Sequence, residues 1–415
     1  GGTFTDCIYR RPDNLVSTLK VLSSGITKGI VEEISGTDRI VDAGRVGDPD
    51  GFWAGYTIRF LSESGHTIHT ARVRKSQGTN GLLGVEQLLP PHVTHGTRYE
   101  LDAGEEAPIL AIRRAMSLSL EEAIPCVSVR LGTTRGTNAL LTRTGARTAF
   151  ITTKGFRDVL LIGNQDRPRL FDLAIQKPEP LFEHTVEIDE RMDSAGVVLK
   201  PPNEDEVRAS LQQLRGTGVE SVAICLLHAF ANSEHEAIVE KIAREVGFTE
   251  VSTSSRLSPL IRIVSRGDTT VADAYLNPIL RDYVERLRTS LGDCTLRMMT
   301  SAGGLVDADQ FVGKDSILSG PAGGVIGFSR VARQAGFEKS LGFDMGGTST
   351  DVSRFDGRYE LEFETQKAGV RIVAPMLAIE TVAAGGGSVC GFDGVRLFVG
   401  PQSAGADPGP ACYGR

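Results

Sequence analysis

The spacing of hydrophobic and polar positions changes along the chain and separates two kinds of segment. Residues 44–103 contain short runs in which apolar and polar residues alternate, bounded by Gly, Pro and Asp, as in Gly55–Leu61 and Thr97–Leu101. A period of two residues is typical of half-buried strands. The pattern therefore predicts a small all-β insertion over residues 44–103.

From residue 107 onward, helical and strand patterns follow each other in turn. Helices are expected over residues 108–120, 137–143, 204–214 and 268–291, and strands over 126–131, 148–153, 219–228, 295–299 and 341–344. Such alternation is typical of helices layered on a sheet. The fold class that the sequence predicts is α/β.

One short motif occurs near each end of the chain. Residues 1–6 read GGTFTD and residues 346–351 read GGTSTD. Paired glycines let backbone N–H groups approach an anion closely, Thr hydroxyls add donors, and Asp can hold a metal ion or its water. Each copy is therefore predicted to be a phosphate loop, and the two copies predict two related domains that face a shared cleft.

The second copy lies in a strand context. Residues 341–345 run into Gly346 and Gly347, and residues 351–355 lead to a turn at Asp356-Gly357, followed by residues 359–363. This order predicts three strands joined by a glycine-rich turn and a tight turn. The first copy begins at its glycines without a preceding strand, so we interpret the chain as an interior piece of a longer protein.

Three further segments carry small or hydroxylic residues at element junctions. Residues 132–139 join a strand to a helix, which suits an anion at a helix N-terminus, although Thr137 acting only as an N-cap is an equal alternative. Residues 319–327 precede a helix and either let a ring or ribose pack closely or form a tight turn. Gly385, Gly386 and Gly387 end an apolar strand, which favours a loop approached by phosphate or substrate.

Composition narrows the function classes. The 415 residues carry a formal net charge of −7, which argues against a nucleic-acid-binding surface. No apolar run reaches the ~20 residues of a membrane helix. The six cysteines are scattered without a Cys-x-x-Cys pair, so neither a zinc site nor a disulfide framework is indicated, and reduced thiols in a cytoplasmic protein are expected.

Taken together and in order, the motifs resemble the ATP-dependent hydantoinase A/5-oxoprolinase family of the actin-like ATPase superfamily. The segments that carry the resemblance, besides the two glycine-threonine motifs, are residues 132–141, 154–158, 162–165, 319–324, 381–388 and 403–413. The resemblance implies two actin/ribonuclease-H-like domains around a nucleotide cleft. We expect residues 1–180 to form the N-terminal domain and residues 181–415 a second domain that continues past the end of the chain.

The resemblance also implies a reaction. ATP with Mg²⁺ phosphorylates the carbonyl oxygen of a cyclic amide such as 5-oxoproline or a hydantoin, and a hydantoinase B-type subunit or fused domain completes the ring opening. The protein is expected to be an oligomer that binds neither nucleic acid nor membrane. Two alternatives are an acetone-carboxylase-type ATP-dependent subunit and an actin-like nucleotide-binding module without substrate chemistry.

Roles are carried over by position. Asp6, Asp344 and Asp351 are candidates for holding Mg²⁺ or positioning water, with Asp344 and Asp6 as the metal ligands. Thr133, Thr134 and Asn138 are expected to line the cleft near the transferred phosphate. Nucleotide contacts are assigned to Gly1, Gly2, Thr3, Thr5, Gly346, Gly347, Thr348, Thr350, Gly320, Gly323, Gly324, Gly385, Gly386 and Gly387.

Overall fold

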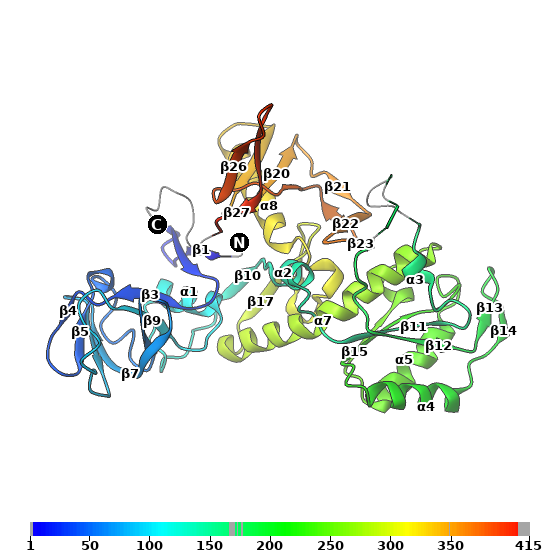
Figure 1. The fold of residues 1–415 in the computed structure, drawn as a ribbon, viewed down its shortest axis with the longest axis horizontal. Coiled ribbons are helices and arrows are strands. Elements are labelled where there is room, and N and C mark those ends of the chain that lie inside the picture. Colours follow the sequence, from blue (N-terminus) through cyan, green and yellow to red (C-terminus); the bar gives the residue numbers. More distant parts are fainter. Residues whose placement is uncertain (1–2, 166–170, 172, 176, 348, 406–415) are drawn as a thin grey trace. The chain divides into compact units, whose positions relative to one another are not determined.

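The computed structural model describes the chain except for residues 1–2, 166–170, 172, 176, 348 and 406–415. The chain divides into two compact units (Figure 1). The first comprises Gly1–Val129 and Tyr283–Leu296, and the second comprises Arg130–Asp282 and Arg297–Arg415. The expected domain boundary at residue 180 falls inside the second unit and stays a prediction, as does the arrangement of two domains around a cleft.

The first unit begins with a hairpin and continues into a β-sheet. Strands β1 (Phe4–Arg10) and β2 (Val16–Leu22) pair antiparallel. A seven-stranded sheet follows within the fully described stretch 27–102, in the order β3-β9-β6-β7-β8-β5-β4. Its strands are β3 (Thr27–Ile30), β4 (Glu33–Ile34), β5 (Arg39–Val41), β6 (Thr57–Leu61), β7 (Thr67–Gln77), β8 (Leu82–Val85) and β9 (Arg98–Asp102). The sheet therefore includes residues before position 44, where the sequence pattern placed the start of a β-rich insertion.

The core of the first unit is aromatic. Trp53 is fully buried and packs edge-on against Phe52 and Tyr56, with ring centroids 4.8 and 4.9 Å away. The Trp53 indole N–H donates to Asp48 over 2.8 Å, which satisfies the polar end of this side chain. Helix α1 (Ala107–Met116) adds apolar side chains to the same core. Val21, Val31 and Ile40 belong to this core too, so residues 44–103 share one hydrophobic core with the segments before position 44.

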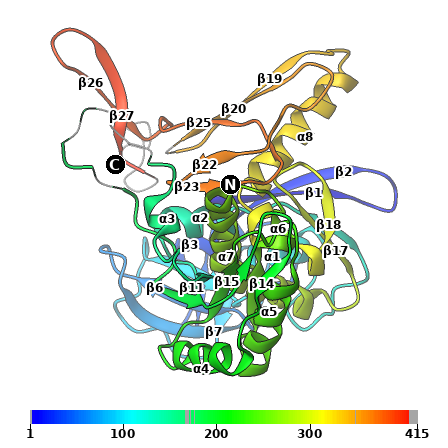
Figure 2. The same ribbon diagram turned by 90° about the vertical axis from the view of Figure 1, so that its right-hand side faces the viewer.

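The second unit is built on a parallel sheet in the order β12-β11-β15-β16. Its strands are β11 (Thr148–Thr153), β12 (His184–Ile188), β15 (Ser221–Cys225) and β16 (Glu250–Thr253), and helices α4 (Glu204–Arg215) and α5 (Glu234–Val246) pack on it (Figure 2). Every residue of β11, β15 and β16 is buried, as is typical of parallel strands that are covered on both faces. The α/β prediction is confirmed.

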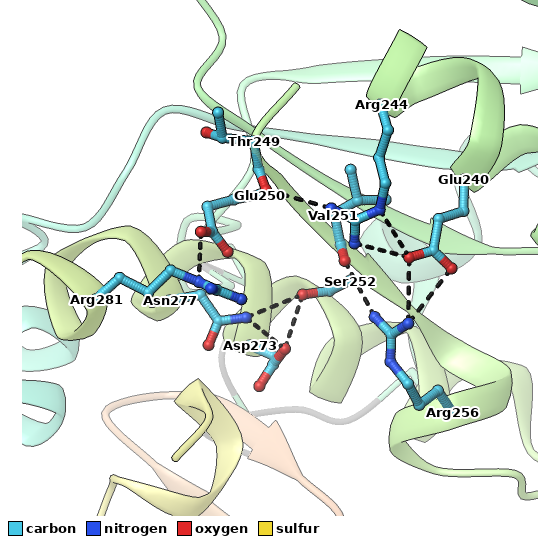
Figure 3. A network of polar contacts seen from close by, with 10 residues as sticks. All are labelled: Glu240, Arg244, Thr249, Glu250, Val251, Ser252, Arg256, Asp273, Asn277 and Arg281. Carbon is cyan, nitrogen blue, oxygen red and sulfur yellow. Dashed lines mark hydrogen bonds and ion pairs between the residues drawn. The ribbon is translucent and has the colours of Figure 1, made fainter. Parts of the chain in front are cut away.

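Helix α7 (Ile263–Leu291) joins this sheet to the segments that follow it through a polar network (Figure 3). The buried carboxylate of Asp273 accepts hydrogen bonds from the Ser252 hydroxyl of β16 and from the Asn277 side chain, over 2.7 and 2.9 Å. It also accepts the backbone N–H of Lys314 over 2.9 Å. Burial raises the pKa of Asp273, and the hydrogen bonds oppose that rise. One carboxylate therefore links the sheet, the long helix and the turn at residues 313–315.

The rest of the second unit consists of helices and short antiparallel strands. These are β10 (Ser128–Leu131), α2 (Arg135–Thr142), α3 (Val159–Ile162), β13 (Arg191–Met192), β14 (Val198–Lys200), α6 (Ser254–Leu257), β17 (Thr295–Met299), β18 (Leu305–Asp307), α8 (Ser319–Gln334), β19 (Ser340–Met345), β20 (Thr350–Phe355), β21 (Leu361–Glu362), β22 (Thr365–Lys367), β23 (Val370–Ile372), β24 (Met376–Leu377), β25 (Glu380–Val382), β26 (Ser388–Phe392) and β27 (Leu397–Ser403). The chain crosses between the units within β10, α7 and β17. Among the described residues, no helix combines the length and apolarity that a membrane span requires.

Two local expectations are corrected. Residues 319–327 lie inside α8 and do not precede a helix, because α8 begins at Ser319. The strand expected over residues 359–363 is reduced to Leu361–Glu362, which pairs with β24 and does not extend the sheet of β20. The sequence pattern indicates only that a helix or a strand forms nearby. Tertiary packing decides where that helix begins and which strand the other one pairs with.

A buried hydrogen bond in the first unit provides a stability test. The Tyr99 hydroxyl donates to the Asp42 carboxylate over 2.5 Å, and both residues are buried. Tyr99→Phe leaves this carboxylate without one of its donors, so the free energy of unfolding should fall by about 1–3 kcal/mol. Denaturant titration followed by fluorescence of Trp53, the only tryptophan, measures the change.

The matched control is Tyr9→Phe. The Tyr9 hydroxyl accepts an exposed hydrogen bond from Arg11 over 3.2 Å, so its loss should change stability by no more than ~0.5 kcal/mol. Equal effects of the two variants would contradict a specific role for the buried pair.

Candidate nucleotide site

Two carboxylates stand opposite each other next to the second glycine motif. Strands β19 and β20 are antiparallel, and Asp344 of β19 pairs directly with Asp351 of β20. Asp351 is in turn opposite Thr381 of β25, whose hydroxyl donates to the Asp351 carboxylate over 2.8 Å. Directly opposed residues project from the same face of a sheet, and two like charges in such a pair repel each other. This arrangement favours a bound cation at Asp344 and Asp351.

The second glycine motif and the triple glycine form one backbone structure. The N–H of Gly386 donates to the carbonyl of Gly346 over 2.9 Å, and the N–H of Gly387 donates to that of Gly347 over 2.7 Å. A Cβ on Gly387 would lie 2.8 Å from the Gly405 carbonyl oxygen and 3.0 Å from that of Gly347. No side chain fits there, so glycine is required at position 387 by close packing.

Two hydroxyl contacts extend this pairing. The Thr350 hydroxyl donates to the Ala384 carbonyl over 2.6 Å, and the Gly385 N–H donates to the Ser388 hydroxyl over 2.8 Å. The structure thus brings together Gly346, Gly347, Thr350 and the triple glycine. Thr348 lies outside the described residues.

A second cluster forms where β10 meets α2. The Ser319 hydroxyl accepts the Thr133 N–H over 3.1 Å, and the Gly320 N–H donates to the Thr133 carbonyl over 3.2 Å. A Cβ on Gly132 would lie 2.9 Å from the Ser319 carbonyl oxygen. The segments at 132–134 and 319–320 are therefore packed backbone to backbone at the start of α8.

Thr137 is not the N-cap of α2, so that alternative is wrong. The N-cap is Thr134, and the Thr137 hydroxyl instead donates to the carbonyl of Ile317. The Asn138 N–H donates to the Thr134 carbonyl over 2.8 Å, which places Thr134 and Asn138 one helical turn apart. Two of the three expected cleft residues, Thr134 and Asn138, thus lie at the N-terminal end of α2.

The three glycines of α8 that were assigned to nucleotide contacts differ in their surroundings. A Cβ on Gly320 would lie 2.9 Å from the Thr134 methyl group, whereas a Cβ on Gly323 or Gly324 would meet nothing within 4 Å. Gly320 is therefore required for packing, and Gly323 and Gly324 present open backbone that a flat ring can approach. Further along α8, the Phe328 ring occupies the space where a Cβ on Gly342 of β19 would lie, so the helix connects the two clusters.

The first glycine motif belongs to the other unit. The Thr5 hydroxyl lies 3.0 Å from the Ser23 hydroxyl, and Asp6 forms an exposed ion pair with Lys20 over 3.1 Å. Thr3 accepts the Ser23 N–H through its carbonyl over 2.9 Å. Gly1 and Gly2 lie outside the described residues. A meeting of the two motifs at one nucleotide stays a prediction.

The donor set fits Mg²⁺ together with phosphate. Within the described part of the chain, no group of three or more His, Cys, Asp or Glu residues is arranged to hold a metal ion. Magnesium is commonly held by one or two carboxylates, with phosphate oxygens and waters completing its shell. The pair Asp344 and Asp351 matches that requirement. Sequence reasoning did not single out Thr381, whose place becomes evident only from the register of β20 and β25.

Comparison with known proteins identifies the family. A sequence model of the hydantoinase/oxoprolinase N-terminal region matches residues 91–247, and one described as hydantoinase/oxoprolinase matches residues 266–415. The chain belongs to the hydantoinase/oxoprolinase family. It is 45% identical over 353 residues to 5-oxoprolinase of Saccharomyces cerevisiae, an alignment that covers 74% of this chain and 27% of the relative. The chain therefore spans about a quarter of the length of this curated relative.

Two solved structures of the hydantoinase/oxoprolinase type resemble the fold. The ATP-dependent caprolactamase of Pseudomonas jessenii is 27% identical, with a TM-score of 0.63. The match covers 88% of this chain and 52% of that one. A nucleotide-free acetone carboxylase is 24% identical with a TM-score of 0.60, over 72% of this chain and 46% of that one. The likeness to acetone carboxylase shows the fold alone.

The carboxylate pair can be tested in the full-length protein. Asp344→Asn removes one of the two charges that favour the cation, so ATP turnover should fall by ~10²–10³ while the fold persists. Steady-state phosphate release at saturating Mg²⁺ measures the effect. Asp356→Asn, on the exposed turn after β20, is the matched control and should keep wild-type turnover. Unchanged turnover in Asp344→Asn would remove this residue from the site.

Proposed function

We propose that this chain is the ATP-using part of an enzyme that opens cyclic amides, with 5-oxoproline as the first substrate to try. The observation that carries the proposal is the joined pair of glycine loops beside Asp344 and Asp351. A glycine turn that an anion can approach closely and a carboxylate pair beside it suit a nucleotide phosphate with Mg²⁺. The N–H groups of Gly346, Gly386 and Gly387 themselves donate to backbone carbonyls and hold the turn in shape. The family membership supports the same reading.

The chemistry explains why ATP is needed. An unactivated amide is a poor electrophile, because its oxygen is a poor leaving group. Transfer of the γ-phosphoryl group to the lactam oxygen breaks the bond between the γ-phosphorus and the β–γ bridging oxygen, and converts the lactam oxygen into a phosphate ester. Water then attacks the activated carbon, and the ring C–N bond breaks as the nitrogen takes up a proton and leaves as the amine. A second water attacks the carbon of the resulting acyl phosphate, and phosphate leaves with the former lactam oxygen. The steps that use water belong to a hydantoinase B-type partner, fused or separate.

In that scheme, the residues of this chain hold the nucleotide in position and neutralise the charge of its phosphates. The loops at 346–347 and 385–387 are proposed to bind the phosphates, and the open backbone at Gly323 and Gly324 the adenosine. When bound, Mg²⁺ draws charge from the phosphate oxygens, and Asp344 and Asp351 hold it or its waters. Phosphoryl transfer relies mainly on such positioning and electrostatic stabilisation. A cytoplasmic location and an oligomeric state belong to the same proposal.

Isotope transfer tests the reaction. With 5-oxoproline labelled with ¹⁸O in the ring carbonyl, the full-length protein and its B-type partner should release phosphate that contains ¹⁸O, because the labelled oxygen is the one phosphorylated. Mass spectrometry of the phosphate reads the result. Omitting the B-type partner is the control and should give slow ATP hydrolysis without ring-opened product. Ring opening with unlabelled phosphate would show that ATP acts by another route.

A further inference from the structure

A cavity of about 730 Å³ lies in the second unit, formed by segments other than the glycine loops. Its walls come from α3, residues 177–182, the hairpin β22–β23 and α7. Its lining combines apolar side chains, among them Leu160, Leu181, Phe182 and Val271, with polar and charged ones. A pocket of this size with a few converging polar groups is typical of a small-molecule site.

The cavity is held open by specific contacts among its walls. The hairpin is fixed to α7, because the Val373 N–H donates to the Thr269 hydroxyl over 2.9 Å and the Ser265 hydroxyl donates to Glu364 over 3.2 Å. On the other side, the Leu160 side chain of α3 fills the space over Gly267, where a Cβ would lie 2.8 Å from it.

The segment at 177–182 is fixed in two ways. The Lys177 ammonium donates to the carbonyls of Leu161 and Ile162 at the end of α3, both over 2.8 Å. Pro178 packs on Gly369 of the hairpin turn, whose φ of +77° suits glycine and whose added Cβ would lie 3.0 Å from the proline ring. The walls are thus mutually supported, and the cavity is part of the fold.

One carboxyl group in the cavity wall, that of Asp268, has no hydrogen-bond partner within the described residues. Asp268 of α7 is half-buried and lines the cavity, and it forms no hydrogen bond to any other residue that the structure describes. Burial raises the pKa of this carboxyl group to about 7, and the guanidinium of Arg371 on β23 opposes the rise. Arg371, Lys177 and Glu179 are the other charged groups that line the cavity. A half-buried carboxyl group without a hydrogen bond costs stability, which a bound ligand with matching polar groups recovers.

We propose that this cavity binds the cyclic amide and that Asp268 recognises the amide group of the ring. An amide in a small ring is held cis, so its N–H and C=O lie side by side. A protonated carboxyl group matches both, because its O–H donates to the lactam oxygen while its C=O accepts the lactam N–H. The apolar walls receive the ring methylenes. This assignment rests on the proposed function and names the group that selects its substrate class.

The cavity is also connected to the nucleotide site along the chain. The hairpin β22–β23 leads through β24 to β25, which carries Thr381 and ends at the triple glycine. The Lys367 ammonium of β22 donates to the Ile379 carbonyl just before β25, over 3.3 Å. The hairpin that lines the cavity and the strand that leads to the triple glycine are thus joined by this hydrogen bond as well as by the chain.

Substitutions at Asp268 distinguish hydrogen bonding of this side chain to the lactam amide from a purely structural role of its charge. Asparagine keeps one donor and one acceptor side by side, whereas leucine of similar size keeps neither. By titration calorimetry of the full-length protein without ATP, Asp268→Leu should weaken the binding of 5-oxoproline by roughly tenfold or more, since a lost pair of hydrogen bonds has about that effect. Asp268→Asn should bind within about threefold of the wild type, well under the tenfold step of 1.4 kcal/mol.

The ligands and controls locate the effect. 2-Pyrrolidinone, a lactam without a carboxylate, should bind and show the same dependence on Asp268, and glutamate, the ring-opened form, should not bind. Asp282→Leu, an exposed position on the same helix, is the matched control and should bind like the wild type. Gln366→Trp, at an exposed position of β22 that borders the cavity, should narrow it and weaken both lactams without loss of the fold.

The results that would overturn this binding site can be told apart from those that would overturn the proposed reaction. Wild-type binding in Asp268→Leu, or an equal loss in Asp268→Asn and Asp268→Leu, overturns amide recognition by Asp268. Undiminished binding in Gln366→Trp overturns the cavity as the site. If isotope transfer to phosphate is observed together with any of these, the reaction stands and the lactam binds elsewhere. If the titrations agree with the proposal but no labelled phosphate forms, the cavity stands and the reaction does not.

Discussion

The close approach of two glycine loops is the constraint on which the candidate nucleotide site depends. The chain at Gly346 and Gly347 is hydrogen-bonded to the chain at Gly386 and Gly387 with no room for a side chain at position 387. The loops extend from the strands that carry Asp344, Asp351 and Thr381, so fixing the loops also fixes the carboxylates. A phosphate-binding turn needs a fixed backbone that an anion can approach closely, and packing between two glycine-rich segments fixes that backbone without side chains.

In the rest of the second unit, helix α7 fixes the positions of the segments that pack on it. Through Asp273 and Asn277 it holds the turn at residues 313–315, which precedes the segment that packs on Thr133. Through Thr269 it holds the hairpin β22–β23. Asp268 lies directly before Thr269 on the same helix, and its carboxyl group makes no hydrogen bond within the described part of the chain. A single rigid helix therefore sets the positions of the α2–α8 junction and of the cavity, and the cavity carboxyl is part of the same scaffold.

The sequence predicted the α/β class and the position of many elements, because hydrophobic periodicity and glycines at turns reflect local backbone preferences. The strand at residues 341–344 and the helix at 204–214 appear almost as expected, as β19 and α4. The interpretation of residues 346–351 as a phosphate loop rests on the residue types of a repeated motif and stays a prediction. The pairing of that loop with the triple glycine could not be predicted, since it joins segments with no shared pattern. Likewise, Thr137 looked like an N-cap because hydroxyl residues favour that position, but its hydroxyl contacts Ile317 far along the chain.

The decisive measurement is a crystal structure of the full-length protein with Mg²⁺ and a non-hydrolysable ATP analogue. The account predicts phosphate oxygens against the backbone of residues 346–347, next to the triple glycine, and the metal ion on the face shared by Asp344 and Asp351, bound directly or through water. A nucleotide bound elsewhere, with both glycine loops and the carboxylate pair free of phosphate and metal, would contradict the account.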